Sequence, residues 1–322
     1  MKKLIAPEPD KVIVADVEPP VIAADEVLVR AVRSLVSPGS ELNRVRRLAD
    51  DTDAKWPNHD LGYAMCGEVV EVGAQVKHLQ PGDRVATMQH HQELVASPTR
   101  ADAVKPTLKI PEGITWDQAP FSLWGRSCYN WTLKADIKPG ETVAVMGLGL
   151  VGLLMTMWAK LRGPGRVIGI DLHESRLKLG RKAGCDVLVN ARERSSVEAV
   201  KELTEGKGAD CTLHCAAGPH VEAFEHSQLM TRHQGRVVLI GIHSRPLTIL
   251  RGEFLWKDLL GGCTDYDMDQ SLFAVGAELI ANGSLPVLDI VTHNVHYTQA
   301  PEVYDMLNHR EHEAGAVLIR WD

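Results

Sequence analysis

The stretch TVAVMGLGLVG at residues 142–152 decides the fold of this chain. Its first five residues are mostly apolar or β-branched, as a buried parallel strand requires. Gly147 permits a tight turn out of that strand, Gly149 lets a pyrophosphate approach the backbone, and Gly152 lets the following helix pack closely. The start of that helix then offers free N–H groups and a positive dipole end to phosphates. The stretch therefore predicts a strand, a phosphate-binding turn and a helix.

A second apolar strand, at residues 167–170, ends in Asp171, which follows Gly152 by 19 residues. A carboxylate at this place can accept hydrogen bonds from both ribose hydroxyls and would repel a 2′-phosphate, which favours NAD over NADP as the cofactor. Further cofactor contacts are expected at the start of the first helix, on the helix after Asp171 and at the ends of later strands, namely at Leu150, Val151, Arg176, Cys215, Ala216, Gly241 and Ile242.

Strands and helices alternate with short connections between residues 142 and 240. Strand-length apolar runs at 142–146, 167–171, 187–189, 211–215 and 236–240 are separated by helical segments at 153–161, 172–183, 195–205 and 220–229. This rhythm predicts an α/β fold of the Rossmann type, with a doubly wound parallel sheet.

The rest of the chain follows a different pattern. Short strands are expected at 12–14, 26–32, 66–72 and 84–87, and the loop at 37–41 should lead into a helix that begins near Ser40 or Glu41. Later segments predict a helix at 116–133, a helix at 270–280, a strand at 289–293 and a helix at 301–307. We therefore expect a β-rich domain of residues 1–118 and 270–322 and a nucleotide domain of residues 119–269, with a ligand cleft between them.

Composition excludes several classes of function. The 322 residues carry a net charge of −7 and no basic tract longer than three residues, which argues against nucleic acid as a partner. No apolar stretch reaches membrane-spanning length, and no apolar core follows the lysines at the N-terminus, so we expect a cytoplasmic protein without a membrane partner. The six cysteines form no Cys-x-x-Cys pair, which argues against a structural zinc lobe.

The order of motifs resembles that of the medium-chain dehydrogenase/reductase family. The matching segments are LGYAMCGEVVEVG at 61–73, PGDRV at 81–85, KPGE at 138–141, the glycine-rich turn at 147–152 and GAD at 208–210. The resemblance implies a GroES-like β-rich catalytic domain, a nicotinamide-binding Rossmann domain and hydride transfer to or from a small-molecule substrate. It also implies a homodimer paired through the edge of the nucleotide-domain sheet, where residues 256–260 resemble the dimer segment.

The chain departs from this family at the catalytic zinc. The positions that resemble the zinc ligands hold Pro38, Tyr63 and Trp124, and Ala64 stands where the family has an acid. Pro, Ala and Trp cannot bind Zn²⁺ and Tyr rarely does, so we expect no metal there. The loop SPGSE at 37–41 resembles a zinc-poor branch that includes bacteriochlorophyllide hydroxyethyl dehydrogenases and sugar or polyol dehydrogenases.

Without zinc, alcohol oxidation still requires a base and a group that stabilises the developing alkoxide. Tyr63 is the first candidate for donor or acid/base, although it could instead only fill the volume of the missing metal. Ser40 resembles the family's proton-relay hydroxyl, or it caps the helix that starts there. Glu41 could orient Ser40, act as the base, or only favour the helix N-terminus.

Four further residues are candidates for substrate contact. Trp124 would wall the pocket or pack in the core. Arg126 could hold an acidic substrate group, or it could face solvent as helix arginines often do. His90 and His91 could reach the cleft, but adjacent strand residues point to opposite faces, so at least one is expected at the surface.

Three functions remain open from the sequence. The leading hypothesis is an NAD-dependent, zinc-independent oxidoreductase that acts on a secondary alcohol, such as a sugar, a cyclitol or another polar ring. The alternatives are a quinone or enoyl reductase that uses NAD(P)H, against which Asp171 argues, and a non-catalytic dinucleotide-binding protein.

Overall fold

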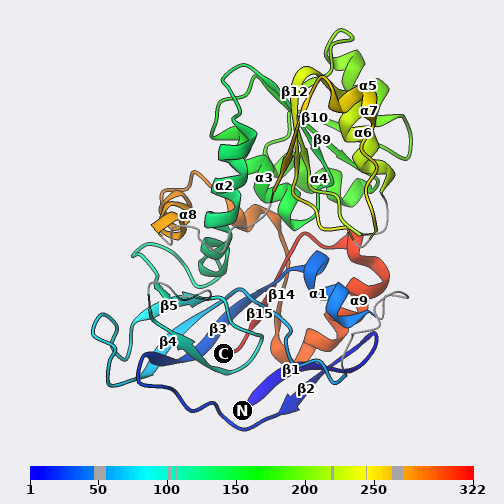
Figure 1. Cartoon of the computed structure of the whole chain (residues 1–322). Helices are drawn as coiled ribbons and strands as arrows, with labels where there is room; N and C mark the ends of the chain where they lie inside the picture. The colour runs from blue at the N-terminus through cyan, green and yellow to red at the C-terminus, as the bar shows by residue number, and fades with distance from the viewer. Residues whose placement is uncertain are drawn as a thin grey trace. The chain divides into compact units, whose positions relative to one another are not determined.

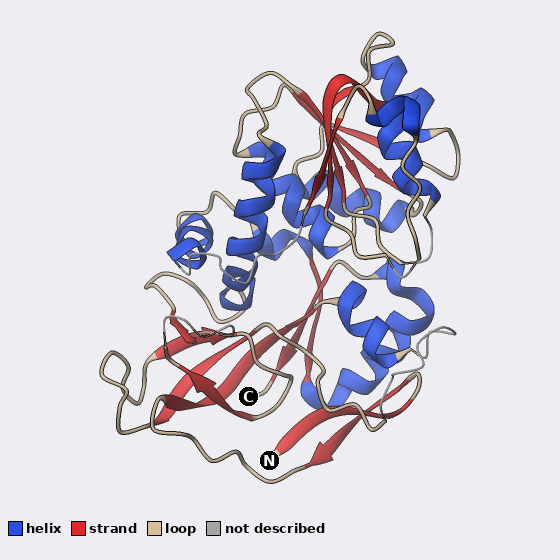
Figure 2. Cartoon of the chain, in the orientation of Figure 1, coloured by secondary structure: helices blue, strands red, loops and turns tan. Residues whose placement is uncertain are grey.

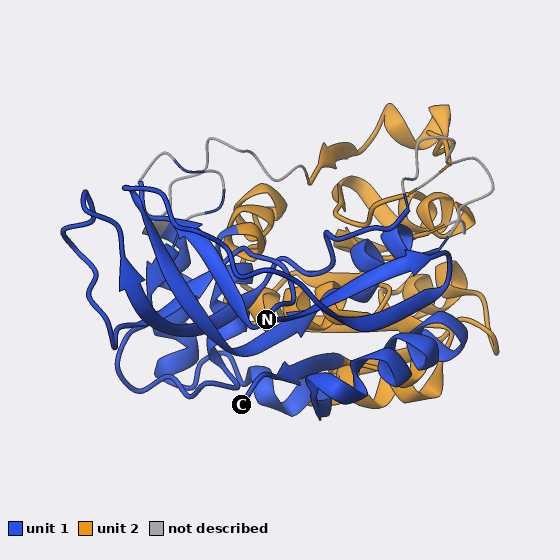
Figure 3. Cartoon of the chain, turned by 90° about the horizontal axis from the view of Figure 1, so that it is seen from below, with its two compact units in different colours: residues 1–126, 266–311, 316–322 blue, residues 127–265, 312–315 orange. Residues whose placement is uncertain are grey.

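The structure is a computed structural model that describes residues 1–46, 56–100, 103, 105, 107–218, 221–243, 245–262 and 271–322. The chain forms two compact units, drawn in different colours in Figure 3. The first unit comprises residues 1–126, 266–311 and 316–322, and the second comprises 127–265 and 312–315. No helix among the described residues is long and apolar enough to cross a membrane.

The second unit contains a six-stranded parallel sheet with the strand order β10-β9-β8-β11-β12-β13. The first strand of this sheet along the chain, β8, lies inside the sheet, and later strands extend it on both sides, which is the doubly wound arrangement that the sequence predicts. The strands are β8 (Thr142–Met146), β9 (Arg166–Asp171), β10 (Val187–Asn190), β11 (Ala209–His214), β12 (Thr231–Leu239) and β13 (Asp258–Gly261).

Helices cover both faces of this sheet (Figures 1 and 2). Helix α3 packs against α4 and helix α5 packs against α6. The helices of this part of the chain are α2 (Gly125–Ala135), α3 (Leu150–Lys160), α4 (Glu174–Ala183), α5 (Ser196–Leu203), α6 (Glu222–Met230) and the short α7 (Arg251–Phe254).

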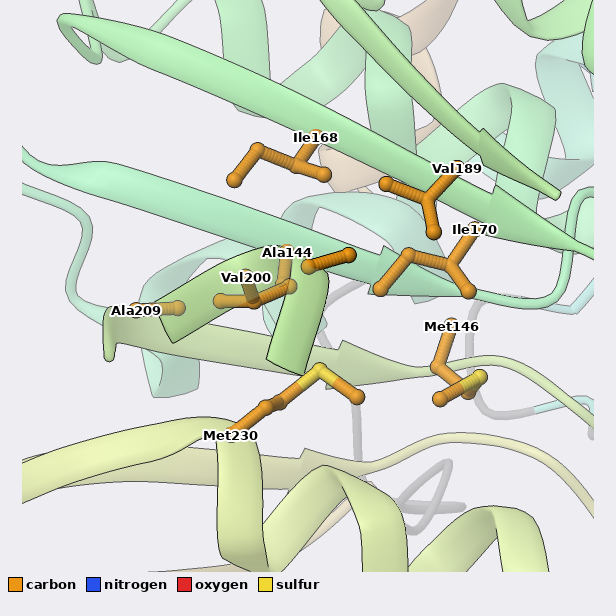
Figure 4. Packing of buried hydrophobic residues seen from close by; sticks show 9 residues of the cluster. Ala144, Met146, Ile168, Ile170, Val189, Val200, Ala209 and Met230 are labelled. Carbon is orange, nitrogen blue, oxygen red and sulfur yellow. The ribbon is translucent and has the colours of Figure 1, made fainter. Parts of the chain in front are cut away.

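Alternation along the strands builds the core beneath one of these helical layers. Ala144 and Met146 of β8 and Ile168 and Ile170 of β9 are buried on one face, together with Val200 of α5 (Figure 4). Residues two apart on a strand share a face, so these side chains form one continuous apolar surface. This packing fixes the strand ends, from which the turns that could hold a cofactor emerge.

The first unit contains a seven-stranded sheet and a separate hairpin of β1 and β2. The sheet has the order β14-β15-β3-β4-β5-β7, and β6 also pairs with β3. Strand β15 pairs antiparallel with β3, so the end of the chain joins the sheet built by its beginning. The strands are β1 (Lys2–Glu8), β2 (Lys11–Asp16), β3 (Glu26–Val36), β4 (Met65–Val72), β5 (Arg84–Thr87), β6 (Leu94–Pro98), β7 (Thr107–Lys109), β14 (Val291–His296) and β15 (Ala316–Arg320).

Short helices complete the first unit. They are α1 (Pro38–Val45), α8 (Ser271–Ala281), α9 (Ala300–Arg310) and the 3₁₀ segments η1 (Ala119–Trp124), η2 (Val287–Ile290) and η3 (Tyr297–Gln299). A further 3₁₀ segment, η4 (Glu311–Glu313), begins at the last residue of this stretch of the first unit and ends in the second unit. Segment η1 packs against α8 and against β3, β4 and β5, so the first unit extends past residue 118, where the sequence places the domain boundary.

Several element boundaries differ from the sequence-based expectations. The expected helix at 116–133 is a 3₁₀ segment followed by α2 from Gly125, where an added Cβ would lie 2.7 Å from Cα of Gly276. The helix at 301–307 begins one residue earlier, and the strand at 289–293 begins only at Val291, after a 3₁₀ turn. The expected starts at 220 and 270 and the domain boundary at 269/270 lie outside the described residues.

Helix α1 begins at Pro38 and not at Ser40 or Glu41. Proline is favoured in the first helical turn because its φ is already helical and its missing N–H would have no partner there. The N-cap residue is therefore Ser37, and Ser40 lies inside the first turn. The prediction that Ser40 caps this helix is wrong.

Candidate functional site

The three glycines of the turn after β8, here called the glycine turn, have different physical roles. Gly147 has φ +90°, which disfavours any other residue, and a Cβ there would lie 2.7 Å from the nitrogen of Ala216. A Cβ on Gly152 would lie 1.9 Å from the carbonyl oxygen of Gly147. Nothing lies within 4 Å of a Cβ placed on Gly149. Two glycines are thus required by packing, and the third leaves the backbone open to a ligand.

The turn leads directly into α3, whose N-cap is Gly149. No side chain caps this helix, which begins with Leu150 and Val151. An uncapped helix N-terminus presents free N–H groups and a positive partial charge. The arrangement fits a dinucleotide pyrophosphate, as the sequence predicts for these residues.

Asp171 ends the neighbouring strand β9 and is buried at the glycine turn. Its Oδ2 accepts the N–H of Leu148 at 2.8 Å, and its Oδ1 accepts the N–H of His173 at 3.0 Å. A guanidinium nitrogen of Arg176 lies 4.0 Å from Oδ2. Nδ1 of His173 also lies 3.3 Å from Oδ1, so Oδ2, with one hydrogen-bond donor and two lone pairs, is the oxygen that can still accept a ribose hydroxyl. Arg176 therefore lies beside the carboxylate expected to bind ribose.

The remaining predicted cofactor residues follow β11 and β12 at the same edge of the sheet. The N–H groups of Cys215 and Ala216 donate to the carbonyl oxygen of Met146 at 2.8 and 2.7 Å. A Cβ on Gly241 would lie 1.7 Å from the carbonyl oxygen of Ala216, and the next residue, Ile242, is 64% exposed. The backbone at the end of β8, after β11 and after β12 is therefore in mutual contact.

Sequence reasoning missed His214, which pairs with His243 beside these strand ends. Nε2 of His214 lies 3.0 Å from Nε2 of His243, and Nδ1 of His214 lies 2.8 Å from the hydroxyl of Ser227. Burial and the neighbouring imidazole lower the pKa of His214 to about 3, and burial also lowers the pKa of His243. Both rings are therefore neutral at physiological pH. The signal in the sequence was His214, a titratable residue at the end of the apolar strand β11.

In the first unit, Tyr63 is part of a group of hydroxyls, here called the hydroxyl cluster, formed by Ser37, Ser40 and Tyr63. The Tyr63 hydroxyl donates to Oγ of Ser37 at 2.6 Å and lies 3.5 Å from Oγ of Ser40. The ring of Tyr63 lies 5.9 Å from that of Trp124. Burial raises the pKa of Tyr63 to about 12, although hydrogen bonds with the two serines oppose the shift. Tyr63 is thus a neutral phenol at physiological pH, suited to donate a hydrogen bond and not to act as a resting base.

Glu41 is fully buried, and its carboxylate is occupied by three donors. Oε1 accepts a hydrogen bond from the N–H of Ser37 at 2.7 Å. Oε2 lies 3.0 Å from Nε2 of His91 and also accepts a hydrogen bond from the hydroxyl of Tyr304. Burial alone would raise the pKa of Glu41, but His91 and these hydrogen bonds lower it overall. A saturated, buried carboxylate has no access to substrate, so the suggestion that Glu41 is the base is wrong. It orients the backbone of Ser37 instead.

His91 belongs to the same buried network and does not face a substrate. It is 0% exposed, and its Nδ1 lies 2.8 Å from the hydroxyl of Ser34, which also accepts the indole N–H of Trp321 at 2.9 Å. Gly62 has φ +86°, and a Cβ there would lie 2.6 Å from the His91 ring. The expectation that His91 reaches a substrate is therefore wrong. No local signal in the sequence links this network to Tyr304, on α9.

His90 and His91 lie in the connection between β5 and β6 and not on a strand, and their rings make separate contacts. Nδ1 of His90 lies 3.0 Å from the carbonyl oxygen of Gly62, and its Nε2 lies 3.3 Å from Asp60. Burial lowers the pKa of His90, and the nearby Lys105 adds to that shift. His90 is partly exposed and outside the hydroxyl cluster, so nothing in its contacts favours a substrate role.

The residues at the family's zinc-ligand positions do not fit a zinc ion. Pro38 and Ala64 are buried and have no side-chain donor, and the Trp124 indole has an N–H but no lone pair for a metal. Among the described residues there is no group of three or more His, Cys, Asp or Glu that could hold a metal ion. The five described cysteines are free, and Cys263 lies outside the described residues.

Trp124 and Arg126 are both buried, so the expectation that Arg126 faces solvent is wrong. Trp124 is 9% exposed and Arg126 is 7% exposed. The Arg126 guanidinium lies over the Phe273 ring, 4.7 Å from its centroid. Trp124 is buried, as core packing requires, and its ring lies 5.9 Å from that of Tyr63. Its role as a wall of the substrate pocket stays a prediction.

Two family models match the chain. Residues 23–105 match the alcohol dehydrogenase GroES-like domain, and residues 151–261 match the zinc-binding dehydrogenase domain. Sorbitol dehydrogenase of Bacillus subtilis is 24% identical over 291 residues, which are 80% of each chain. An L-threonine 3-dehydrogenase of Vibrio cholerae is 28% identical over 288 residues, 81% of this chain and 82% of the relative.

Solved structures share the fold over the full length. One is a protein described as a short chain alcohol dehydrogenase of Escherichia coli CFT073, in complex with NADH. It superposes with a TM-score of 0.83 at 18% identity and covers 99% of both chains. The two family matches together span more than half of the chain, and with these relatives they place the protein in the medium-chain dehydrogenase/reductase family, as an alcohol dehydrogenase-like oxidoreductase.

Proposed function

We propose that the protein is an NAD-dependent, zinc-independent oxidoreductase that moves hydride between a secondary alcohol and nicotinamide. The observation that carries this proposal is the Tyr63 hydroxyl, hydrogen-bonded to Ser37 at a position where the family places a zinc ligand. Sugars, cyclitols and other polar rings are the substrate class that the resemblance of the loop at 37–41 supports.

The glycine turn and Asp171 would hold the cofactor. The open surface at Gly149 and the uncapped start of α3 suit the pyrophosphate, and Asp171 suits a ribose with free hydroxyls. Bound NAD supplies the hydride acceptor for alcohol oxidation. The buried Asp171 carboxylate would repel a 2′-phosphate, and this supports NAD over NADP.

The hydroxyl cluster would stabilise the negative charge that develops on the substrate oxygen. If the Tyr63 O–H turned from Ser37 to an alkoxide, with the Ser37 hydroxyl then donating to the Tyr63 oxygen, it would stabilise the alkoxide by roughly 2–4 kcal/mol in a site that excludes water. Ser40 lies near Tyr63 and is partly exposed, so it offers the departing proton a path to water. Glu41 acts indirectly, because it fixes Ser37, the acceptor that orients the Tyr63 hydroxyl.

The proposal is tested with two assays on the purified protein. Titration with NADH and NADPH, followed by fluorescence, should show tighter binding of NADH. Incubation with NAD and a panel of secondary alcohols should then increase the absorbance of reduced nicotinamide. Preference for NADPH together with reduction of quinones or enones would instead support a reductase, and NADH binding without any turnover would support a non-catalytic protein.

A homodimer is also part of the proposal. Among the described residues, β13 pairs on one side only, as the last strand of its sheet. The residues before it, Phe254, Leu255 and Trp256, are 54–61% exposed. Exposed apolar groups beside an unpaired strand edge favour pairing with a second sheet.

Trp256→Glu should therefore shift a dimer to monomers, because it places a charge beside the paired edges. Light scattering after size-exclusion chromatography would measure the mass, with Leu161→Glu as the control, since Leu161 is 42% exposed away from this strand. A wild-type protein that is already monomeric at micromolar concentration would contradict the proposed dimer.

A further inference from the structure

Arg126 is a buried cation that lacks an anion in the described structure. It is 7% exposed, and its Nε is shielded from solvent without a hydrogen-bond partner. No carboxylate among the described residues lies within ion-pair distance of its guanidinium. The guanidinium instead lies over the face of the Phe273 ring. Burial lowers the pKa of Arg126, and no neighbouring anion opposes that shift.

Two partly buried arginines in the described part of the chain do have such partners, whereas a third, Arg84, lies over the Trp116 ring and donates to the carbonyl oxygen of Ile114. Arg33 pairs with Asp117 at 2.6 Å and with Asp322 at 2.9 Å. Arg236 pairs with Glu141 at 2.5 Å and also donates to the carbonyl oxygen of Ala135. Buried charges in proteins are normally paired because the loss of hydration is otherwise uncompensated. Within the described residues, no anion therefore compensates for the hydration that Arg126 loses on burial.

A second donor without an acceptor lies two residues earlier. The indole Nε1 of Trp124 is shielded from solvent, and no group in the described part of the molecule accepts its hydrogen. Cα atoms two residues apart are at most about 7 Å apart. The Trp124 ring also lies 5.9 Å from Tyr63, which connects this stretch to the hydroxyl cluster. In the described structure, two buried hydrogen-bond donors therefore lack acceptors, and one of them is positively charged. An anion with several oxygen atoms is the kind of ligand that could accept their hydrogen bonds.

We propose that Arg126 binds a carboxylate or phosphate group of the alcohol substrate, which makes the preferred substrates anionic alcohols. This inference rests on the proposed function and narrows its substrate class. The planar guanidinium suits both groups, because its fork of N–H donors matches two oxygens of either one. Arg126 is in this view a specificity-determining residue, and the alcohol function is handled by the hydroxyl cluster.

The first test measures binding without turnover. Thermal unfolding of the full-length protein is followed with inorganic phosphate, glycerol 3-phosphate, glycerate and glycerol, at equal ionic strength and without cofactor. A ligand of the folded state raises the unfolding temperature, and the shift grows with the logarithm of one plus the ratio of the free ligand concentration to the dissociation constant. We expect at least one of the three anions to do so and glycerol not to. Glycerate alone would identify a carboxylate as the recognised group, and glycerol 3-phosphate or phosphate alone would identify a phosphate.

Arg126→Met should abolish this anion-dependent shift, and Arg126→Lys should weaken anion binding at least fivefold, because a lysine keeps the charge but loses the fork. Without anions, Arg126→Met should unfold at the wild-type temperature or above it, since it removes an unpaired buried charge. Arg236→Met is the matched control and should unfold at a lower temperature, because it leaves Glu141 without its partner.

The second test uses turnover with NAD on neutral and anionic alcohols of equal carbon number. Arg126→Met should lower the ratio of kcat/KM for the anionic alcohol to that for the neutral one at least tenfold. An Arg126→Met protein that loses as much thermal stability as Arg236→Met, or that keeps the anion-dependent shift, would overturn the inference. Absence of turnover in wild-type protein with an intact, Arg126-dependent shift would refute the proposed function and retain the anion site.

Discussion

The glycine turn of the second unit and the hydroxyl cluster of the first unit relate to the family in opposite ways. The glycine turn retains the family's motif in full, with Gly147, Gly149 and Gly152 in register and an acid at the end of the next strand. The hydroxyl cluster includes Tyr63 and adjoins Pro38, at positions where the resemblance to the family implies ligands for zinc. In the proposed function, the glycine turn keeps the backbone shape of the family, and the hydroxyl cluster takes over the chemistry of the zinc ion.

The difference follows from how each region works. The glycine turn depends on missing side chains, because a Cβ at Gly147 or Gly152 would collide with backbone atoms. Few substitutions are compatible with such a shape, whatever the substrate. The first unit instead holds Tyr63 through Ser37 and Glu41, and an oxygen can be stabilised by a metal or by hydroxyl donors. The residues expected to bind the cofactor are therefore easier to identify from the sequence than those expected to act on the substrate.

The largest effect should come from the removal of one oxygen atom in the hydroxyl cluster. Tyr63→Phe should lower kcat by roughly 100- to 1000-fold, because the developing charge loses its donor. The dissociation constant for NADH should not change. Tyr297→Phe, whose ring stacks on Trp321 in the same unit, is the control. Near-normal turnover of Tyr63→Phe would reduce Tyr63 to a packing residue.

Two alanine substitutions in the glycine turn separate packing from ligand access. Gly152→Ala should lower the free energy of unfolding by about 1–3 kcal/mol, since its Cβ collides with the Gly147 carbonyl. Gly149→Ala meets no protein atom, so it should leave that free energy unchanged and still weaken NADH binding about tenfold or more. Urea unfolding and fluorescence titration would measure the two quantities. Unchanged NADH affinity in Gly149→Ala would contradict a pyrophosphate at this position.

A smaller effect is expected at Asp171. Asp171→Ser should shift the ratio of NAD to NADP efficiency by about tenfold toward NADP, because it removes the repulsion of a 2′-phosphate and the ribose hydrogen bonds. Steady-state kinetics with both cofactors would measure the ratio. Asp186→Ser, another acid near the sheet but paired with Lys160, is the control. An unchanged ratio would refute the ribose assignment.

The smallest effect concerns acid stability at the strand ends of the second unit. The pKa of His214 is about 3 in the folded state, below the ordinary value near 6.5, so the unfolded state binds more protons between these values. Stability should be complete above about pH 6.5 and fall by about 1 kcal/mol per pH unit below it. His214→Gln should flatten this dependence in thermal unfolding between pH 8 and pH 5. The same slope in both proteins would contradict the assignment.

The parts that the sequence predicts best are those encoded by neighbouring residues. The alternation of strands and helices and the spacing from Gly152 to Asp171 are local, and the doubly wound sheet follows from them. The buried network around Glu41 is not local, because His91 and Tyr304 reach it from 50 and 263 residues away. Solvent exposure of Arg126 was also misjudged, since helix periodicity does not show that α8 covers it with Phe273.

The central claim is that protein hydroxyls, and not a metal, control the charge on the substrate oxygen. Turnover of an identified alcohol should be measured before and after exhaustive chelation, with metal content determined on the same samples. The account predicts much less than one equivalent of zinc per chain and an unchanged kcat. One tightly bound zinc per chain, whose removal abolishes turnover and whose return restores it, would contradict the account.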